Sequence, residues 1–403
     1  METLPLELLQ RIFFFATIDG GATSCSLALV SKHIHSVSQY HRLDNVALMG
    51  RPKYMMALTR RLEAEKERNA TSRGRLRHLF LSCTQSQYLQ LVEKSKRSFS
   101  RHEGPVYLPE GYAPLNGAND STIDSGSLHA HTSAFRYAKF INDLLHAAAS
   151  GLETLAIIFL ERDLTQYIRL PSTLPTLREL TVSGAPPSWL LDLAEPRPPH
   201  QPPRFPALRR LHWYDRRGPG GTLDDIPAVA ERLPALTHFR ITGYMGDSMP
   251  GVFDACADED MLERVEDSVE PWDHRTHPKG WYGLPDFTIE STLDPPKVPL
   301  LPQWRGLRQF VIQPSFVSFI DDFEYDKEGV FELRLMWMSL ASASLPVYVF
   351  APISWMYSGS GQAESVDMLH LYHEERIRGD LGCWADGEKG RRAMQNDYPQ
   401  YLH

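Results

Sequence analysis

The sequence predicts an α/β protein in which a small N-terminal module of three helices precedes an irregular solenoid of strands and helices. Two observations predict this fold. The first fifty residues hold three short helical patterns, and a hexad of the form Leu-x-x-Leu-x-apolar then recurs six times along the chain. The last two apolar positions of each hexad are two residues apart, so they point to the same side of a short strand. Stacked strands of this kind share a core that no single strand could bury alone.

Residues 1–50 are expected to form the helical module. Pro5 suits a first helical turn, and Glu7 in that turn favours the positive end of the helix. The apolar residues at helical spacing in this first helix are Leu8, Ile12, Phe15 and Ala16. The expected stop and cap residues are Gly20-Gly21 after the first helix, Thr23 or Ser24 before the second, and Ser31 before the third. An ordinary helical hairpin is the alternative interpretation.

Residues 51–75 are expected to form a connecting helix and a linker. The helix spans Pro52 to Asn69, with Tyr54, Leu58 and Leu62 on one face. Residues 76–353 then form the repeat domain, interrupted by a mobile loop at about 104–132 and by an acidic insertion at about 244–302. Residues 354–403 are expected to form a C-terminal helix or cap and a polar tail.

The hexads define the strands of the repeat domain. They comprise Leu76, Leu79, Leu81; Leu152, Leu155, Ile157; Leu177, Leu180, Val182; Leu208, Leu211, Trp213; Leu236, Phe239, Ile241; and Leu307, Phe310, Ile312. A seventh candidate comprises Leu345, Tyr348 and Phe350. The central starts are 25, 31 and 28 residues apart, at or just above the leucine-rich-repeat period of about 20–29 residues. Helices between strands are expected at Ala134–Ala149, from Thr222 to Leu233 and around Phe331–Ser339. A closed α/β domain whose strands merely share leucines is the alternative.

Composition argues against several classes of protein. No apolar run approaches the roughly 20 residues that span a bilayer, and Glu2 and Glu7 argue against a secretory signal. The four cysteines are far apart and show no metal-ligand spacing. A reducing compartment, the cytoplasm or the nucleus, is therefore predicted.

Charge is unevenly distributed in this chain of net charge −8. Residues 51–101 hold thirteen Lys/Arg against four Asp/Glu, whereas residues 244–300 hold four against thirteen. These segments could meet an acidic and a basic partner, or they could be two solvated faces. Nucleic-acid binding is not expected, because neither stacking aromatics nor a known binding module accompanies the basic segment.

The N-terminal motif resembles the F-box. The residues that carry the resemblance are Leu4, Pro5, Glu7, Leu8 and Ile12, followed by Leu27, Leu29, Val30, Ser31 and Lys32. Together with the hexads, they resemble F-box proteins of the fungal type that carry irregular leucine-rich repeats. The resemblance implies a substrate receptor of an SCF-type ubiquitin ligase. In such a complex the F-box docks on a Skp-type adaptor, which links it to cullin and RING subunits, while the repeats hold a protein substrate.

The resemblance also implies which residues make contacts. Contact with the Skp-type adaptor is expected from Leu4, Pro5, Leu8, Ile12, Leu27 and Val30. Internal packing among the three helices is the alternative for these residues, above all for Ile12 and Leu27. Because proximity alone drives ubiquitin transfer to a held substrate, no catalytic residue, cofactor or metal is expected, and the chain is predicted not to be an enzyme.

Substrate contacts are expected on the side of the strands opposite the hexad residues. If the hexad residues point inward, the intervening residues lie on an open, concave face. The best candidates are His212, Tyr214, Arg240 and Thr242, since Tyr and Arg are enriched in binding hot spots. A plain solvated face is the alternative.

Two other functions remain open. The chain could be a repeat scaffold outside any ligase. It could also be a metal-dependent enzyme, because His370, His373 and Glu374 would share one helix face at spacing i, i+3, i+4, although they match no known metal signature.

Overall fold

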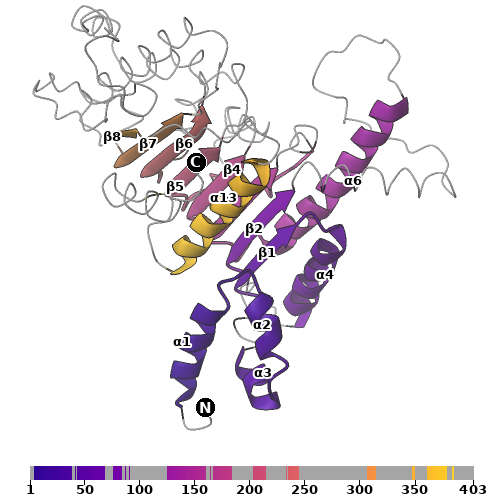
Figure 1. Ribbon diagram of the computed structural model, residues 1–403, viewed down its shortest axis with the longest axis vertical. Helices are drawn as coiled ribbons and strands as arrows, with labels where there is room; N and C mark the ends of the chain where they lie inside the picture. The colour runs from indigo at the N-terminus through magenta and orange to yellow at the C-terminus, as the bar shows by residue number, and fades with distance from the viewer. Residues whose placement is uncertain are drawn as a thin grey trace, which may run out of the picture. The chain divides into compact units, whose positions relative to one another are not determined.

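The chain folds as an α/β protein with two compact units (Figure 1). The computed structural model describes residues 4–38, 41, 43–68, 76–83, 87, 90, 125–159, 164, 167–183, 203–214, 233, 235–244, 306–314, 347–349, 361–378 and 384. The first unit comprises residues 1–208 and 358–383, and the second comprises residues 209–357 and 384–403. The range predicted as one repeat domain, 76–353, is thus divided between the two units.

The first unit combines a parallel sheet with most of the described helices. Its helices are α1 (Leu6–Ala16), α2 (Ala22–Leu27), α3 (Lys32–Ser38), α4 (Pro52–Arg68), α6 (Ser125–Ala148) and α13 (Gly361–Arg378). Its strands are β1 (Asn45–Met49), β2 (His78–Cys83), β3 (Thr154–Phe159) and β4 (Glu179–Ser183), and they pair in chain order, all parallel. None of the helices described in the chain is both long and apolar enough to cross a membrane.

The second unit contains four parallel strands, again adjacent in chain order. They are β5 (Arg210–Tyr214), β6 (His238–Tyr244), β7 (Gln309–Pro314) and β8 (Val347–Val349). The helices predicted from Thr222 and at Phe331–Ser339, nearly all of the acidic insertion and the polar tail lie outside the described residues.

The strand register confirms that the hexads form strands with a shared apolar side. In the first unit, Leu79, Leu155 and Leu180 align across the sheet, and Leu81, Ile157 and Val182 align two residues later. The second unit repeats the arrangement with Leu211, Phe239 and Phe310, and then with Trp213, Ile241 and Ile312. The leucine that opens each hexad is buried.

Several strands begin with a local structure that recurs along the chain. Three hexads open with a turn in which the leucine N–H donates to the carbonyl oxygen three residues earlier: Leu177 to Leu174, Leu208 to Phe205 and Leu236 to Leu233. Proline is the second residue of each turn, where its fixed φ favours the bend. The carbonyl that precedes one strand also accepts two N–H groups from the next segment, as Glu153 does from Arg178 and Glu179, and Thr237 does from Arg308 and Gln309.

Helix α6 covers the hexad side of the sheet in the first unit. The ring of its Tyr137 contacts Phe159, which has the same strand parity as Leu155 and Ile157. Helix α4 packs beside α6 and buries Leu58 and Leu62, as predicted. Tyr54, predicted on this face, is exposed instead, and Met55 is buried.

Three sequence-based boundaries are corrected by the structure. The end of the predicted helical module contains strand β1, whose Val46 and Leu48 pair with Leu79 and Leu81. Residues 125–132, predicted as part of a loop, belong to α6. In β8, Val347 and Val349 align with Phe310 and Ile312, so Tyr348 is out of register with the hexad positions.

Gly20 connects the helical module to the first strand and tolerates no side chain. Its φ is +71°, and a Cβ placed there would lie 2.5 Å from Cβ of Ala47. We expect Gly20→Ala to lower the free energy of unfolding by about 3 kcal/mol, from the left-handed backbone and the clash together. Gly21→Ala is the control, because its φ is +107° but the nearest atom to its Cβ would be 3.8 Å away. Urea denaturation showing equal losses for both variants would contradict this explanation.

Candidate functional site

Helix α1 has two apolar faces, and only one is packed. Leu9 and Phe13 are each 2% exposed and form a small core with Ile34 and Val37 of α3. Leu8, Ile12 and Phe15, on another face, are 49%, 47% and 49% exposed. The first face holds the three helices together, and the second contacts nothing comparable among the described residues.

The junction between α2 and α3 adds two further exposed apolar side chains. Leu29 is 88% exposed and Val30 is 66% exposed. We call Leu4, Leu6, Leu8, Ile12, Phe15, Leu29 and Val30 the exposed apolar set of the helical module. Soluble proteins commonly expose single apolar residues, but several on one small module are typical of an interaction surface.

The structure places most of the residues predicted for adaptor contact at the surface. Leu4, Pro5, Leu8, Ile12 and Val30 are exposed. Leu27 is partly buried and packs against the core of the module, as its alternative interpretation stated. The residues predicted from the sequence for adaptor contact did not include Leu6, Phe15 and Leu29, which are also exposed.

Local hydrogen bonds explain how the three helices are positioned. Pro5 is the N-cap of α1, and its carbonyl accepts the N–H groups of Leu8 and Leu9. Asp19, not Thr23 or Ser24, caps α2: its Oδ2 accepts from the Thr23 N–H at 2.8 Å. Ser31 caps α3 as predicted, accepting from the Ile34 N–H at 3.2 Å.

The helical module is attached to the edge of the sheet in the first unit. The side-chain amide of Asn45 in β1 donates to the carbonyl of Ile18, and the Ala47 N–H donates to the carbonyl of Gly20 at 3.2 Å. Ile18 is buried. These contacts fix the loop between α1 and α2, while the exposed face of α1 takes no part in them.

The predicted substrate-binding face of the second unit is not open. His212, Tyr214 and Arg240 are each 1% exposed, and Thr242 is fully buried. The ring of Trp384 contacts His212 edge-on, with centroids 6.4 Å apart. The prediction of an open concave face at these four side chains is therefore wrong.

These buried groups form a connected polar cluster. Thr242 Oγ1 lies 2.9 Å from His212 Nε2 and accepts a hydrogen bond from Arg240 Nε at 3.0 Å. Burial, and then the charge of Arg240, hold the pKa of His212 well below its usual value. The imidazole is thus neutral at pH 7, and the cluster lies inside the unit.

Helix α13 covers the corresponding face in the first unit. Its His370 and His373 rings contact Phe80 of β2, with centroids 4.7 and 5.6 Å apart. His370 Nε2 lies 3.9 Å from Glu374 Oε1. Among the described residues, no group of three His, Cys, Asp or Glu side chains is arranged to hold a metal ion.

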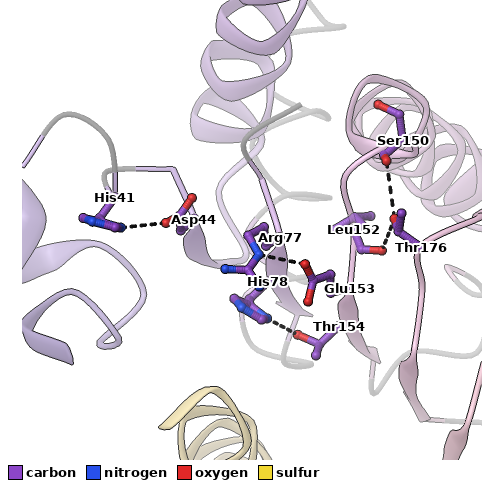
Figure 2. Close-up of polar contacts among 9 residues, drawn as sticks. All are labelled: His41, Asp44, Arg77, His78, Ser150, Leu152, Glu153, Thr154 and Thr176. Carbon is purple, nitrogen blue, oxygen red and sulfur yellow. Dashed lines mark hydrogen bonds and ion pairs between the residues drawn. The ribbon is translucent and has the colours of Figure 1, made fainter. Parts of the chain in front are cut away.

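Polar side chains link the starts of neighbouring strands beside this face (Figure 2). Arg77 Nε donates to Glu153 Oε1 at 2.8 Å, and this hydrogen bond lowers the pKa of the Glu153 carboxyl. His78 Nδ1 lies 2.9 Å from Thr154 Oγ1. Burial lowers the pKa of His78 to about 4, so this histidine is neutral at pH 7.

The exposed apolar set is the strongest candidate site in the described part of the chain. Its side chains are large and accessible, whereas the polar clusters under Trp384 and α13 are enclosed. Comparison of the chain with models of protein families, with curated proteins and with solved structures finds no match.

Proposed function

We propose that this protein is the substrate receptor of an SCF-type ubiquitin ligase in the cytoplasm or nucleus. Helices α1–α3 act as an F-box that docks on a Skp-type adaptor, and through it on the cullin and RING subunits. The strands form an irregular leucine-rich-repeat-like solenoid that holds a protein substrate. The receptor contributes position rather than chemistry, so it needs no cofactor or catalytic residue of its own.

The observation that carries this proposal is the exposed face of α1. Leu8, Ile12 and Phe15 each leave about half of their surface in water, although the neighbouring face of the same helix is packed. Covering such a side chain contributes roughly 1 kcal/mol at about 25 cal/mol per Å². A partner that covers the whole set gains several kcal/mol, which favours a protein-binding role for this face.

The repeated strand entry supports the second half of the proposal. The turn with proline and the carbonyl that accepts two N–H groups recur at equivalent places of successive hexads. Parallel strands in chain order, with a recurring way of entering the strand, are typical of solenoid repeats.

A pull-down with the Skp-type adaptor tests the function. Leu8→Asp combined with Ile12→Asp should weaken adaptor binding by roughly a hundredfold or more, because two charges would be desolvated in the interface. The packed residues Leu9 and Phe13 are unchanged, so the module should stay folded. Tyr54→Asp is the matched control: Tyr54 is an apolar residue of similar exposure, 44%, on α4. It should bind as the wild-type chain does.

The same experiment separates the ligase receptor from a repeat scaffold. Failure of the intact chain to bind the adaptor would exclude the receptor function and favour a scaffold. Equal binding by the double variant and by Tyr54→Asp would show that α1 is not the docking element.

A further inference from the structure

Helix α13 is remote in sequence from the strands that it covers. It follows β8 of the second unit, yet it belongs to the first unit and packs against β2 (Figure 1). It lies on the side of Phe80, whereas α6 lies on the side of Cys83 and Phe159, to which Tyr137 points. The sheet of the first unit is thus covered on both faces, and the second cover comes from the far end of the chain.

The contacts of α13 combine an ion pair with a small apolar surface. Arg376 Nε donates to Glu179 Oε2 at 3.0 Å, and both side chains are largely buried. Glu179 is the one acidic residue in β2, β3 and β4. Among the side chains of the helix that the structure describes, the buried apolar ones are Val366, Leu369 and Ile377.

Among the described residues, two buried polar atoms of this interface have no hydrogen-bond partner. His373 Nε2 and Ser82 Oγ are buried and have no hydrogen-bond partner. Ser82 has the same strand parity as Phe80, so it belongs to the face that α13 covers. A buried polar atom without a partner costs about 1–3 kcal/mol. Docking of α13 is therefore less favourable than its buried area suggests.

The sheet does not depend on α13 for its backbone hydrogen bonds. Strands β1–β4 pair with one another in a continuous parallel ladder, and α6 covers the hexad side independently. Release of α13 would leave this ladder and the main apolar core in place. A released state of α13 is therefore compatible with a folded sheet.

We propose that the face of β2–β4 beneath α13 is a helix-binding surface, that α13 is its internal occupant, and that an amphipathic helix bearing an arginine, presented by a partner protein, takes its place. Glu179 selects the arginine by a charge-assisted hydrogen bond, and Phe80 receives the apolar side of the helix. That the partner is a ligase substrate rests on the proposed function. The surface itself does not.

A labelled peptide with the sequence of residues 361–378 serves as the probe in anisotropy titrations of the full-length chain. In the wild-type chain the tethered α13 has a high effective concentration and should exclude the peptide. The Arg376→Glu chain repels its own α13 from Glu179, so it should bind the peptide at least roughly tenfold more tightly than the wild-type chain does.

Charge reversal supplies the matched controls. A peptide with Arg376→Glu should bind the Arg376→Glu chain at least roughly tenfold more weakly than the unaltered peptide does. A chain with Glu179→Arg alone should reverse this preference. A chain with both Glu179→Arg and Arg376→Glu restores the ion pair with opposite polarity and should exclude both peptides. The absence of peptide binding to the Arg376→Glu chain, or binding that ignores the charge at residue 376, would overturn the proposal.

Hydrogen exchange of the Arg376→Glu chain distinguishes release from unfolding. Exchange should increase in α13 while β1–β4 stay protected. Joint loss of protection in α13 and β2–β4 would show that α13 is an integral part of the core and would also overturn the proposal. These variants lie outside α1–α3, so the adaptor pull-down should be unchanged by them. A failed pull-down leaves the peptide result valid, and a failed peptide titration leaves the pull-down valid.

Discussion

Leu155→Ala is expected to lower the free energy of unfolding of the first unit by about 4 kcal/mol. Leu155 is 1% exposed and lies in β3 between Leu79 and Leu180, at the centre of the ladder of hexad positions. Removal of its three outer carbon atoms leaves a cavity that neighbours on both sides cannot fill without moving. The loss can be measured by urea denaturation of the full-length chain, followed through the hydrogen exchange of β2–β4.

Leu48→Ala is the control for this prediction. Leu48 occupies an aligned position, next to Leu81, but β1 is the first strand of the ladder and Leu48 is only partly buried. We expect a loss of about 1 kcal/mol, since less surface is returned to water and the cavity opens to solvent. Equal losses at Leu48 and Leu155 would contradict a core that is centred on the hexads.

Acidification from pH 7.5 to 5 is expected to destabilise the first unit by about 4 kcal/mol, through His78 and His373 together. Burial lowers the pKa of His78 to about 4 and that of His373 to about 3. Both are neutral at pH 5 in the folded protein, whereas both take up a proton in the unfolded chain, where the pKa is about 6.5. The contribution of these two histidines to stability is therefore fully present above about pH 7, and it is lost as the pH drops through 6.5.

The charged and titratable neighbours of these two histidines determine the pH range in which the histidines alone change the stability. Arg77, Glu153 and Asp44 act on His78, and His78 and His370 act on His373. The carboxyl of Glu153 has a lowered pKa in the folded protein. Its contribution to stability is therefore present above the ordinary pKa of 4.5 and is lost at lower pH. Between pH 7.5 and 5 the two histidines therefore dominate the slope.

His373→Leu should remove about half of this pH dependence. The variant should be at least as stable as the wild-type chain at pH 7.5, because the buried His373 Nε2 has no hydrogen-bond partner to lose. At pH 5 it should be more stable by about 2 kcal/mol. Urea denaturation at the two pH values measures both effects. An unchanged slope between them would show that His373 is already protonated at pH 5 in the folded state.

The strands were predictable because their signals are local. A proline turn, a leucine and two apolar residues at spacing two specify where each strand starts and which side is apolar. The seventh hexad was placed wrongly. Leu345, Tyr348 and Phe350 match the hexad pattern as well as the other six sets do, so the pattern alone could not exclude them. Pairing with Phe310 and Ile312 selected Val347 and Val349 instead.

The faces of α1 could not be assigned from periodicity. Apolar residues surround this helix, so Leu8 and Ile12 fit a buried stripe as well as Leu9 and Phe13 do. Packing against Ile34 and Val37 of α3 decided which pair is buried. The same contact left Leu8 and Ile12, both predicted for adaptor contact, at the surface.

The sequence by itself determined the α/β class, six of the strands, the shared side of their apolar residues and the apolar character of the helical module. Each of these follows from side chains a few residues apart, whose geometry the backbone dictates. The tertiary structure alone decided that β1 joins the sheet, that His212, Tyr214, Arg240 and Thr242 are enclosed, and that α13 covers β2. Such outcomes depend on contacts between segments up to hundreds of residues apart, and no local pattern encodes which distant segment will cover a polar sheet face.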